Sequence, residues 1–418
     1  MFRKSTLNNR LTVLTESMES VRSVAVGIWL KRGSRHERAD EGGLAHFIEH
    51  MVFKGTERRS QAAIAQEMDS IGGQTDAFTT QEYAGFHAKV LDEHVPQALD
   101  LLSDIVLAPR FEPEELERER MVILEEIKSV DDNPEELVHD LFGEAFWAGH
   151  PLGRPILGKP ADIEAFSRGD ISRFFRKTYA PSNILVAAAG RLEHERILSL
   201  VEGSFSELSA PPDGHADTPP RSVAHVGLHE KDLELAHLVL GSEAPAQASP
   251  DRHTAYVLDA ILGGNLSSRL FQVIREERGL AYTVYSGLSA FSDAGEFSIY
   301  AGTDPRNVAE VIDLVLRELR RIQVQPVEAD ELRRAKDHLR GSILLGLEST
   351  NARMSQLARQ EMYYGCHVSA EQSIRGIEAV RAEDVSRLAA RMFGSRPLAM
   401  TILGRLDQMK SIPESLVA

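Results

Sequence analysis

The sequence predicts an α+β protein made of two similar α/β sandwich domains, each a mixed, mainly antiparallel sheet packed with helices. Alternating apolar runs typical of strands, such as residues 23–31 and 295–301, occur together with amphipathic helical stretches in both halves of the chain. The 418 residues also exceed the roughly 100 to 200 residues of an ordinary domain. We therefore expect one α/β pattern, built twice.

A stretch rich in Pro, Gly, Ser and Asp, residues 206–221, separates the two periodic regions. This composition is typical of a linker without regular structure. We predict an N-terminal domain at residues 1–208, a linker at residues 209–221 and a C-terminal domain at residues 222–418.

The two halves look like degenerate copies of one another. The run VPQALDLL in the first half parallels VAEVIDLVL in the second, and each precedes a proline-containing turn and a second amphipathic helix. When these second helices are aligned, Glu119 and Glu126 of the first half face Ala335 and Ser342 of the second. We predict an internal duplication in which only the first half kept its carboxylates, so that the C-terminal domain holds no metal.

The composition is that of a globular protein and restricts its chemistry. Cys366 is the only cysteine, which excludes disulfides within the chain and leaves His, Asp or Glu to bind any metal. The formal net charge of -16 argues against nucleic acid as a partner, because phosphates are neutralised by an excess of Lys and Arg. No segment approaches the roughly 20 apolar residues of a membrane span, and the first residues lack the apolar stretch of a secretory signal. We expect a cytoplasmic protein.

Residues 41–54, EGGLAHFIEHMVFK, are predicted to form a helix with two distinct faces. One face is an apolar stripe formed by Leu44, Phe47, Ile48 and Met51. The other carries His46 and His50 four residues apart, with Glu49 between them. A catalytic zinc site takes three protein ligands and leaves a position for water, and Glu49 in the inverted motif H-x-x-E-H can act as the base. The alternative is a solvated face or a hydrogen-bonded cluster in the core.

The helix predicted at residues 114–130 supplies a third ligand. Glu119 and Glu126 fall within the arc of its apolar stripe, whereas Glu125 lies on the opposite side. Buried carboxylates are normally paired, hydrogen-bonded or bound to metal, because an uncompensated one is costly. We assign Glu126 as the ligand and Glu119 as a carboxylate that orients a histidine. Ion pairing with Arg residues is the alternative.

Several segments, in order along both halves, resemble the pitrilysin, insulinase and mitochondrial processing peptidase family. They are GSRHE from Gly33, GLAHFIEHMVFKGT from Gly43, DAFTTQE from Asp76, ERERMVILEEI from Glu117 and RGLAYTVYS from Arg278. The chain is most similar to the short bacterial members of this family. The resemblance implies a zinc endopeptidase that cleaves extended peptides or unfolded segments, with one zinc ion per chain.

The resemblance also implies roles for single residues of the first half. The ligand role falls to His46, His50 and Glu126. Glu49 becomes the base and Glu119 the family's auxiliary glutamate. The interval that ends at Glu126 is one residue shorter than in the large members, which makes Glu125 a nominal rival, although helical phase favours Glu126.

Two further parts of the site follow from the resemblance alone. Arg278 and Tyr285 match a pair that reaches the substrate from the second domain and helps stabilise the tetrahedral intermediate. The strand that resembles the family's substrate-binding edge carries Asp76, Ala77, Phe78 and Thr79. The family often has Asn at the position of Asp76, and the extra charge would affect side-chain preference.

The resemblance implies a chamber that encloses peptides between two halves, so a short chain would need a partner to close it. We expect a homodimer, in which the pair formed by Arg278 and Tyr285 acts on the same chain or on the partner. Two other functions stay open. One is a non-catalytic peptide-binding or assembly subunit, and the other is an active subunit that requires a different, catalytically silent partner.

Overall fold

The computed structural model describes residues 1–418 apart from 210–217, 395, 410–411, 414–415 and 418. The chain forms two compact units, neither of which is continuous in sequence. Unit 1 comprises Met1–Ser129, Arg154–Thr218 and Leu345–His367, and unit 2 comprises Val130–Gly153, Pro219–Leu344 and Val368–Ala418. Residues 210–217 of the predicted linker at 209–221 lie outside the described residues. Within the described part of the chain, no helix combines the length and the apolar character needed to cross a membrane.

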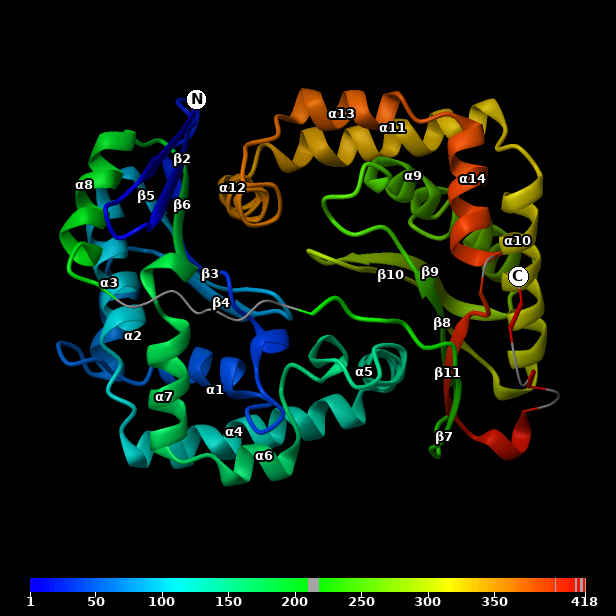
Figure 1. The fold of residues 1–418 in the computed structure, drawn as a ribbon, viewed down its shortest axis with the longest axis horizontal. Helices are drawn as coiled ribbons and strands as arrows, with labels where there is room; N and C mark the ends of the chain where they lie inside the picture. The colour runs from blue at the N-terminus through cyan, green and yellow to red at the C-terminus, as the bar shows by residue number, and fades with distance from the viewer. Residues whose placement is uncertain (210–217, 395, 410–411, 414–415, 418) are drawn as a thin grey trace. The chain divides into compact units, whose positions relative to one another are not determined.

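Unit 1 is built on a six-stranded sheet in the order β1-β2-β6-β3-β5-β4 (Figure 1). Its strands are β1 (Phe2–Thr6), β2 (Thr12–Ser17), β3 (Ser23–Leu30), β4 (Gln74–Thr79), β5 (Ala84–Leu91) and β6 (Ile184–Gly190). β2 and β6 pair in parallel, and the other neighbouring strands pair antiparallel. Among the described strands β4 pairs only with β5, so β4 is an edge strand.

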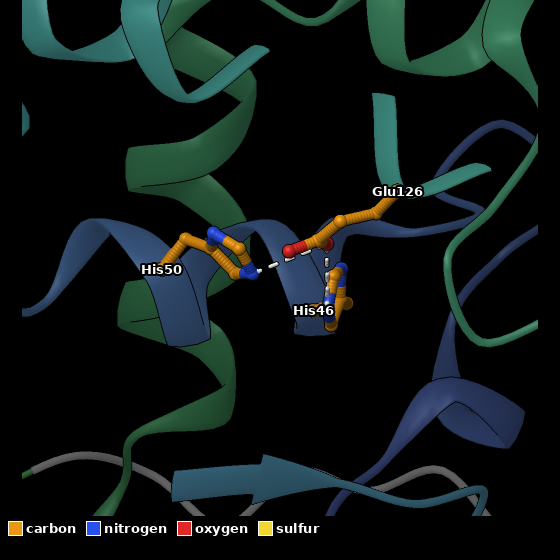
Figure 2. A group of neighbouring side chains, drawn as sticks. All are labelled: His46, His50 and Glu126. Atoms are coloured by element: carbon orange, nitrogen blue, oxygen red, sulfur yellow. Dashed lines mark ion pairs between the residues drawn. The ribbon is translucent and has the colours of Figure 1, made fainter. Parts of the chain in front are cut away.

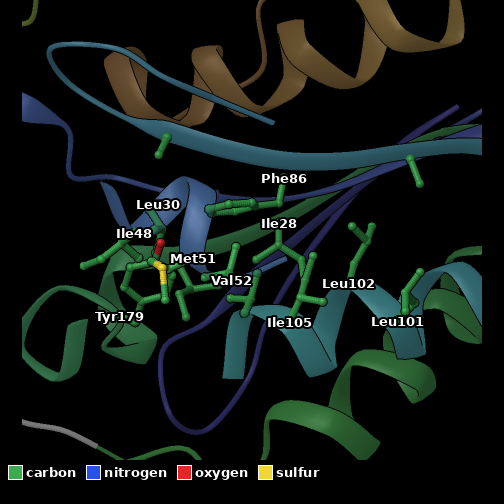
Figure 3. Packing of buried hydrophobic residues seen from close by; sticks show 14 of the residues in the cluster. Ile28, Leu30, Ile48, Met51, Val52, Phe86, Leu101, Leu102, Ile105 and Tyr179 are labelled. Carbon is green, nitrogen blue, oxygen red and sulfur yellow. The ribbon is translucent and has the colours of Figure 1, made fainter. Parts of the chain in front are cut away.

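Helices α1 (Leu44–Met51) and α3 (Val95–Leu107) cover one face of this sheet. Figure 3 shows Ile28 and Phe86 of the sheet within the apolar layer that includes Met51 of α1 and Ile105 of α3. Burying a large apolar side chain contributes about 1.5–3 kcal/mol, so this layer fixes α1 on the sheet. Besides α12 (Thr350–Tyr364), the other helices that begin in this unit are α2 (Gln61–Ser70), α4 (Pro113–Asp132), α6 (Pro160–Ala165), α7 (Arg168–Thr178) and α8 (His194–Phe205).

The opposite face of the sheet is covered by α12 (Thr350–Tyr364), which comes from the second half of the sequence. Successive side chains of a strand point to opposite faces, so the sheet can bury both. Met354 and Leu357 of α12 pack against Trp29 and Leu185 on this side.

Unit 2 contains a five-stranded sheet in the order β7-β11-β8-β10-β9. Its strands are β7 (Val226–Glu230), β8 (Ala236–Glu243), β9 (Ala281–Ala290), β10 (Gly295–Thr303) and β11 (Ala399–Gly404). β7 and β11 pair in parallel and the other neighbours antiparallel. Without β1, both sheets place their strands in the chain order first, fifth, second, fourth, third. This shared connectivity is what a duplication produces, and the prediction of two similar α/β domains with mixed, mainly antiparallel sheets is confirmed.

Helices cover both faces of the second sheet as well. The helices of this unit are α5 (Pro134–Phe146), α9 (Arg252–Leu262), α10 (Val308–Val324), α11 (Ala329–Gly346), α13 (Ala370–Glu378) and α14 (Ala382–Phe393). Phe142 and Phe146 of α5 pack against Val239 and Leu403 on one face, and α9, α10 and α14 share the core on the other. α5 follows α4 in the chain as α12 follows α11. The segments predicted at 1–208 and 222–418 therefore exchange one helix each.

Candidate metal centre

The short helix α1 buries one face and leaves a polar face free. Its buried side chains are those of the predicted stripe, Leu44, Phe47, Ile48 and Met51. Gly43 precedes the helix with a φ of 94°, a left-handed conformation that favours glycine. A Cβ on Gly43 would also meet the carbonyl oxygen of Leu157 at 2.7 Å. With the apolar stripe fixed on the sheet, His46, Glu49 and His50 lie on the remaining face.

Three side chains from two helices point toward one another (Figure 2). Oε2 of Glu126, on α4, lies 3.5 Å from Nε2 of His50 and 3.8 Å from Nε2 of His46. One possible ligand atom from each residue lies within 4.8 Å of the other two. The imidazole rings meet edge to face, with centroids 4.7 Å apart. The structure thus brings together the three residues predicted as ligands.

The atoms of this group suit a metal ion. Oε2 of Glu126, the atom that faces both imidazoles, is buried without a hydrogen-bond partner among the described residues, whereas buried polar atoms are normally bonded. Tetrahedral zinc with bonds of about 2.0–2.2 Å holds its ligand atoms roughly 3.4 Å apart, close to the spacing found around Glu126. Burial, together with nearby His50, lowers the pKa of His46 to about 3. His46 therefore stays in the neutral form that binds metals.

A chain of polar contacts fixes the ring of His50. Its Nδ1 atom lies 3.1 Å from Oε2 of Glu119, whose Oε1 atom lies 2.8 Å from Nζ of Lys54. Glu119 is only 5% exposed, and these contacts compensate its buried charge. A carboxylate at Nδ1 favours the tautomer that leaves the Nε2 lone pair free, so Glu119 lies where an orienting carboxylate is needed.

Glu49, the predicted base, does not belong to the group formed by His46, His50 and Glu126, but it lies next to that group. The Oγ1 hydroxyl of Thr79 donates a hydrogen bond of 2.5 Å to Oε2 of Glu49. Burial raises the pKa of Glu49, and the bond from Thr79 opposes this shift. A raised pKa brings a carboxylate closer to the range in which it can both accept and release a proton near neutral pH.

The two adjacent glutamates of α4 have different surroundings. Oε1 of Glu125 accepts a bond of 2.6 Å from Nζ of Lys128 on the exposed side of the helix. Glu126 lies beside Ile127, which belongs to the buried stripe of α4. The placement of Glu126 beside the histidines agrees with the helical phase that favours it over Glu125.

Strand β4 places the four predicted substrate-binding residues on two faces of the sheet edge. Ala77 packs against the core that includes α1, and Thr79, on the same face, contacts Glu49. Phe78 packs on the opposite face, beneath α12. The exposed carboxylate of Asp76 accepts a bond of 3.0 Å from the backbone N–H of Ala77.

Arg278 and Tyr285 lie in unit 2. Nη1 of Arg278 lies 2.8 Å from Oε1 of Glu310. The hydroxyl of Tyr285, on β9, donates a bond of 2.9 Å to Oε1 of Glu135 and lies 3.1 Å from Nε2 of His139. Burial and the bond to Glu135 raise the pKa of Tyr285, so its phenol stays protonated and able to donate.

Some side chains that complete these contacts were not predicted from the sequence. Lys54 lies three residues beyond the end of α1, so helical spacing could not have identified it. Glu135 and His139 belong to α5, whose sequence pattern indicates only an amphipathic helix. Their contacts with Tyr285 depend on α5 packing in unit 2, for which the sequence carries no local signal.

Comparisons with known sequences place both halves of the chain in the same peptidase family. The family model described as insulinase (peptidase family M16) matches residues 12–160, and that described as peptidase M16 inactive domain matches residues 165–339. A Mycobacterium tuberculosis protein named "uncharacterized zinc protease" is 39% identical over 100% of this chain and 96% of its own length. A Bacillus subtilis protein of the same description is 36% identical over 98% of this chain and 100% of its own length.

Two solved structures share the fold. A protease from Helicobacter pylori matches with a TM-score of 0.90 at 22% identity, covering 96% of this chain and 99% of that one. A peptidase M16 inactive domain from Pseudomonas fluorescens also gives a TM-score of 0.90, at 21% identity, covering 99% of this chain and 100% of that one. The full-length relatives and the two family matches go beyond the fold and confirm the predicted resemblance: this chain belongs to the insulinase family of peptidases, peptidase family M16.

Proposed function

We propose that this chain is a zinc-dependent endopeptidase that hydrolyses extended peptides or unfolded protein segments. The observation that carries the proposal is the convergence of His46, His50 and Glu126, with Glu49 held beside them. Its similarity over the whole length to relatives named zinc proteases supports zinc as the metal. We expect one zinc ion per chain, because three protein ligands make one catalytic site and leave a position for water.

The mechanism assigns a task to each side chain. His46, His50 and Glu126 would hold zinc, which when bound polarises the scissile carbonyl and lowers the pKa of water. The carboxylate of Glu49 takes a proton from the attacking water as the water oxygen bonds to the carbonyl carbon. Glu49 then gives this proton to the amine nitrogen as the C–N bond breaks. The bond from Thr79 to Oε2 of Glu49 leaves Oε1 for the proton transfer.

An extended peptide would bind as an added strand along the edge of β4. Backbone hydrogen bonds to this edge, which spans the predicted residues 76–79, would hold a peptide with little regard to its sequence. Thr79 ties the end of β4 to the base, so a peptide in this position would run past Glu49. The exposed carboxylate of Asp76 would favour a basic side chain in the peptide.

We propose a homodimer as the active assembly, in which Arg278 and Tyr285 donate hydrogen bonds to the oxyanion. Each of these side chains already has a partner, since Arg278 pairs with Glu310 and Tyr285 bonds to Glu135. Binding of substrate would therefore exchange these partners. The native mass of the protein expressed alone tests the homodimer, and a monomeric mass would contradict it.

Mixing two inactive variants tests whether the protomers share their sites. Glu49→Gln removes the base and Tyr285→Phe removes the donor, so each variant alone is expected to lose most of its activity. If Tyr285 serves the partner, a mixed dimer regains one complete site and activity returns. Peptide cleavage by the mixture is the measurement, with each variant alone at the same total concentration as control. No recovery at any ratio argues against shared sites.

Cleavage of a diverse peptide library with and without a chelator tests the proposed reaction. We expect cleavage to stop after chelation and to return when zinc is added, because the metal is needed for the attack of water. The same fragments map the side-chain preference. Protein that holds no zinc in non-chelating buffer and cleaves nothing would favour a non-catalytic peptide-binding or assembly subunit. Cleavage only after a second protein is added would favour an active subunit with a silent partner.

A further inference from the structure

Glu37, the last residue of the GSRHE segment, caps the beginning of α1. Its Oε2 atom accepts a bond of 3.0 Å from the N–H of Gly43, and its Oε1 atom accepts one of 2.7 Å from the N–H of Ala45. The first N–H groups of a helix have no partner inside the helix. Gly43, at the N-cap position, has no side chain that could supply one. The carboxyl group of Glu37, six residues before Gly43, accepts these hydrogen bonds instead.

Glu37 is itself held firmly in place. It is only 3% exposed, and Nη1 of Arg154 donates bonds to the carbonyl oxygens of Glu37 and Arg38 at 3.2 and 2.9 Å. Burial raises the pKa of Glu37 to about 8, against the opposing effect of its two backbone donors. The start of α1 therefore cannot shift without breaking two bonds to a fixed, buried group.

The other end of GSRHE is fastened to the turn that follows β4. The N–H of Ser34 donates to the carbonyl oxygen of Thr80 at 3.1 Å, and the N–H of Arg35 donates to that of Gln81 at 2.8 Å. Nη1 of Arg35 forms an ion pair of 2.6 Å with Glu82, and both side chains are buried. The segment GSRHE thus connects the start of α1 to the end of β4, the strand whose Thr79 bonds to Glu49.

We propose that Glu37 is a positioning residue of the metal centre, whose carboxyl group sets the direction in which α1 presents His46 and His50. This inference rests on the proposed ligand role of the two histidines. Ala45 immediately precedes His46, so a movement of the capped end passes directly to the first imidazole. α1 has only 8 residues and His50 lies one turn after His46, so the second imidazole moves with the helix as a whole.

The zinc affinity of Glu37 variants, measured by competition with a chromogenic chelator, tests this role. Glu37→Gln keeps the shape of the side chain and one of its two acceptors, whereas Glu37→Ala removes both. We expect zinc to bind about 10-fold more weakly in Glu37→Gln and about 100-fold more weakly in Glu37→Ala, the range found for residues that support metal ligands. Should the alanine variant fail to fold, the glutamine variant carries the test.

Two controls separate positioning from stability. Glu41 is a buried glutamate of the same loop whose side chain accepts a bond of 2.9 Å from the N–H of Arg38, so Glu41→Gln removes neither of the two bonds from the start of α1 to Glu37. Val201→Ala lowers the melting temperature from a core position on α8. Both are expected to bind zinc as the unmodified chain does.

Three results would overturn the inference. Unchanged zinc affinity in folded Glu37→Gln would show that the cap does not act on the ligands. Equal weakening in Val201→Ala, at a matched melting temperature, would show a general effect of stability. Absence of zinc binding by the unmodified chain would overturn the proposed function itself, and this inference with it.

Discussion

Replacing Glu49 with Gln is expected to lower kcat for peptide cleavage by about 10²–10⁴-fold while zinc stays bound. The amide of Gln cannot take a proton from the attacking water, so the step assigned to Glu49 is lost. Glu49 lies outside the group His46, His50 and Glu126, which leaves the metal ligands unchanged. Steady-state cleavage of a peptide from the library, measured beside zinc content, checks both parts of this result.

The control for this variant is Glu67→Gln on α2. Glu67 is exposed and pairs with Arg59 at 2.9 Å, so Glu67→Gln makes the same change of charge outside the site. We expect this variant to cleave at the rate of the unmodified chain. If Glu49→Gln cleaved at nearly that rate, the base would have to be another residue.

Glu126→Gln is expected to lose zinc, and peptide cleavage with it. The amide cannot supply the anionic oxygen that faces His46 and His50 in the structure, so two neutral ligands would remain. We expect the affinity to fall by more than the roughly 10- to 100-fold typical of a lost supporting residue. Zinc content after dialysis and chelator competition measure this effect.

The neighbouring residue provides a matched control. Glu125→Gln makes the same change of charge one position away. Within the described part of the chain, the side chain of Glu125 bonds to the exposed Lys128. This variant is expected to keep both zinc and activity. Full zinc content in Glu126→Gln, or its loss in Glu125→Gln, would reassign the third ligand.

Parts of the site that depend on helical periodicity could be predicted from the sequence. A stripe of apolar side chains fixes which face of a helix is buried, and the phase of every other residue follows from it. This is why the histidines of α1 and Glu126 of α4 lie where the pattern places them. In the aligned second helices, Glu119 and its counterpart Ala335 are both buried, whereas Glu126 is partly buried and its counterpart Ser342 is exposed.

Other features depend on contacts between distant segments, for which the sequence carries no local signal. Thr79 reaches Glu49 from a strand 30 residues away, and Glu37 reaches Gly43 across a loop without regular spacing. The exchange of α5 and α12 is of the same kind. Both helices are amphipathic, and their patterns do not indicate which of two similar sheets each will cover.

The exchanged helices make the two halves of the polypeptide depend on each other. Residues 1–208 by themselves would lack α12, so Trp29 and Leu185 would face water in place of Met354 and Leu357. The second half alone would likewise leave Val239 bare without α5. Apolar surfaces of this kind promote aggregation. A chain cut between its halves would thus behave as a split protein. Its fragments would remain soluble only while α12 of one fragment and α5 of the other cover these apolar surfaces.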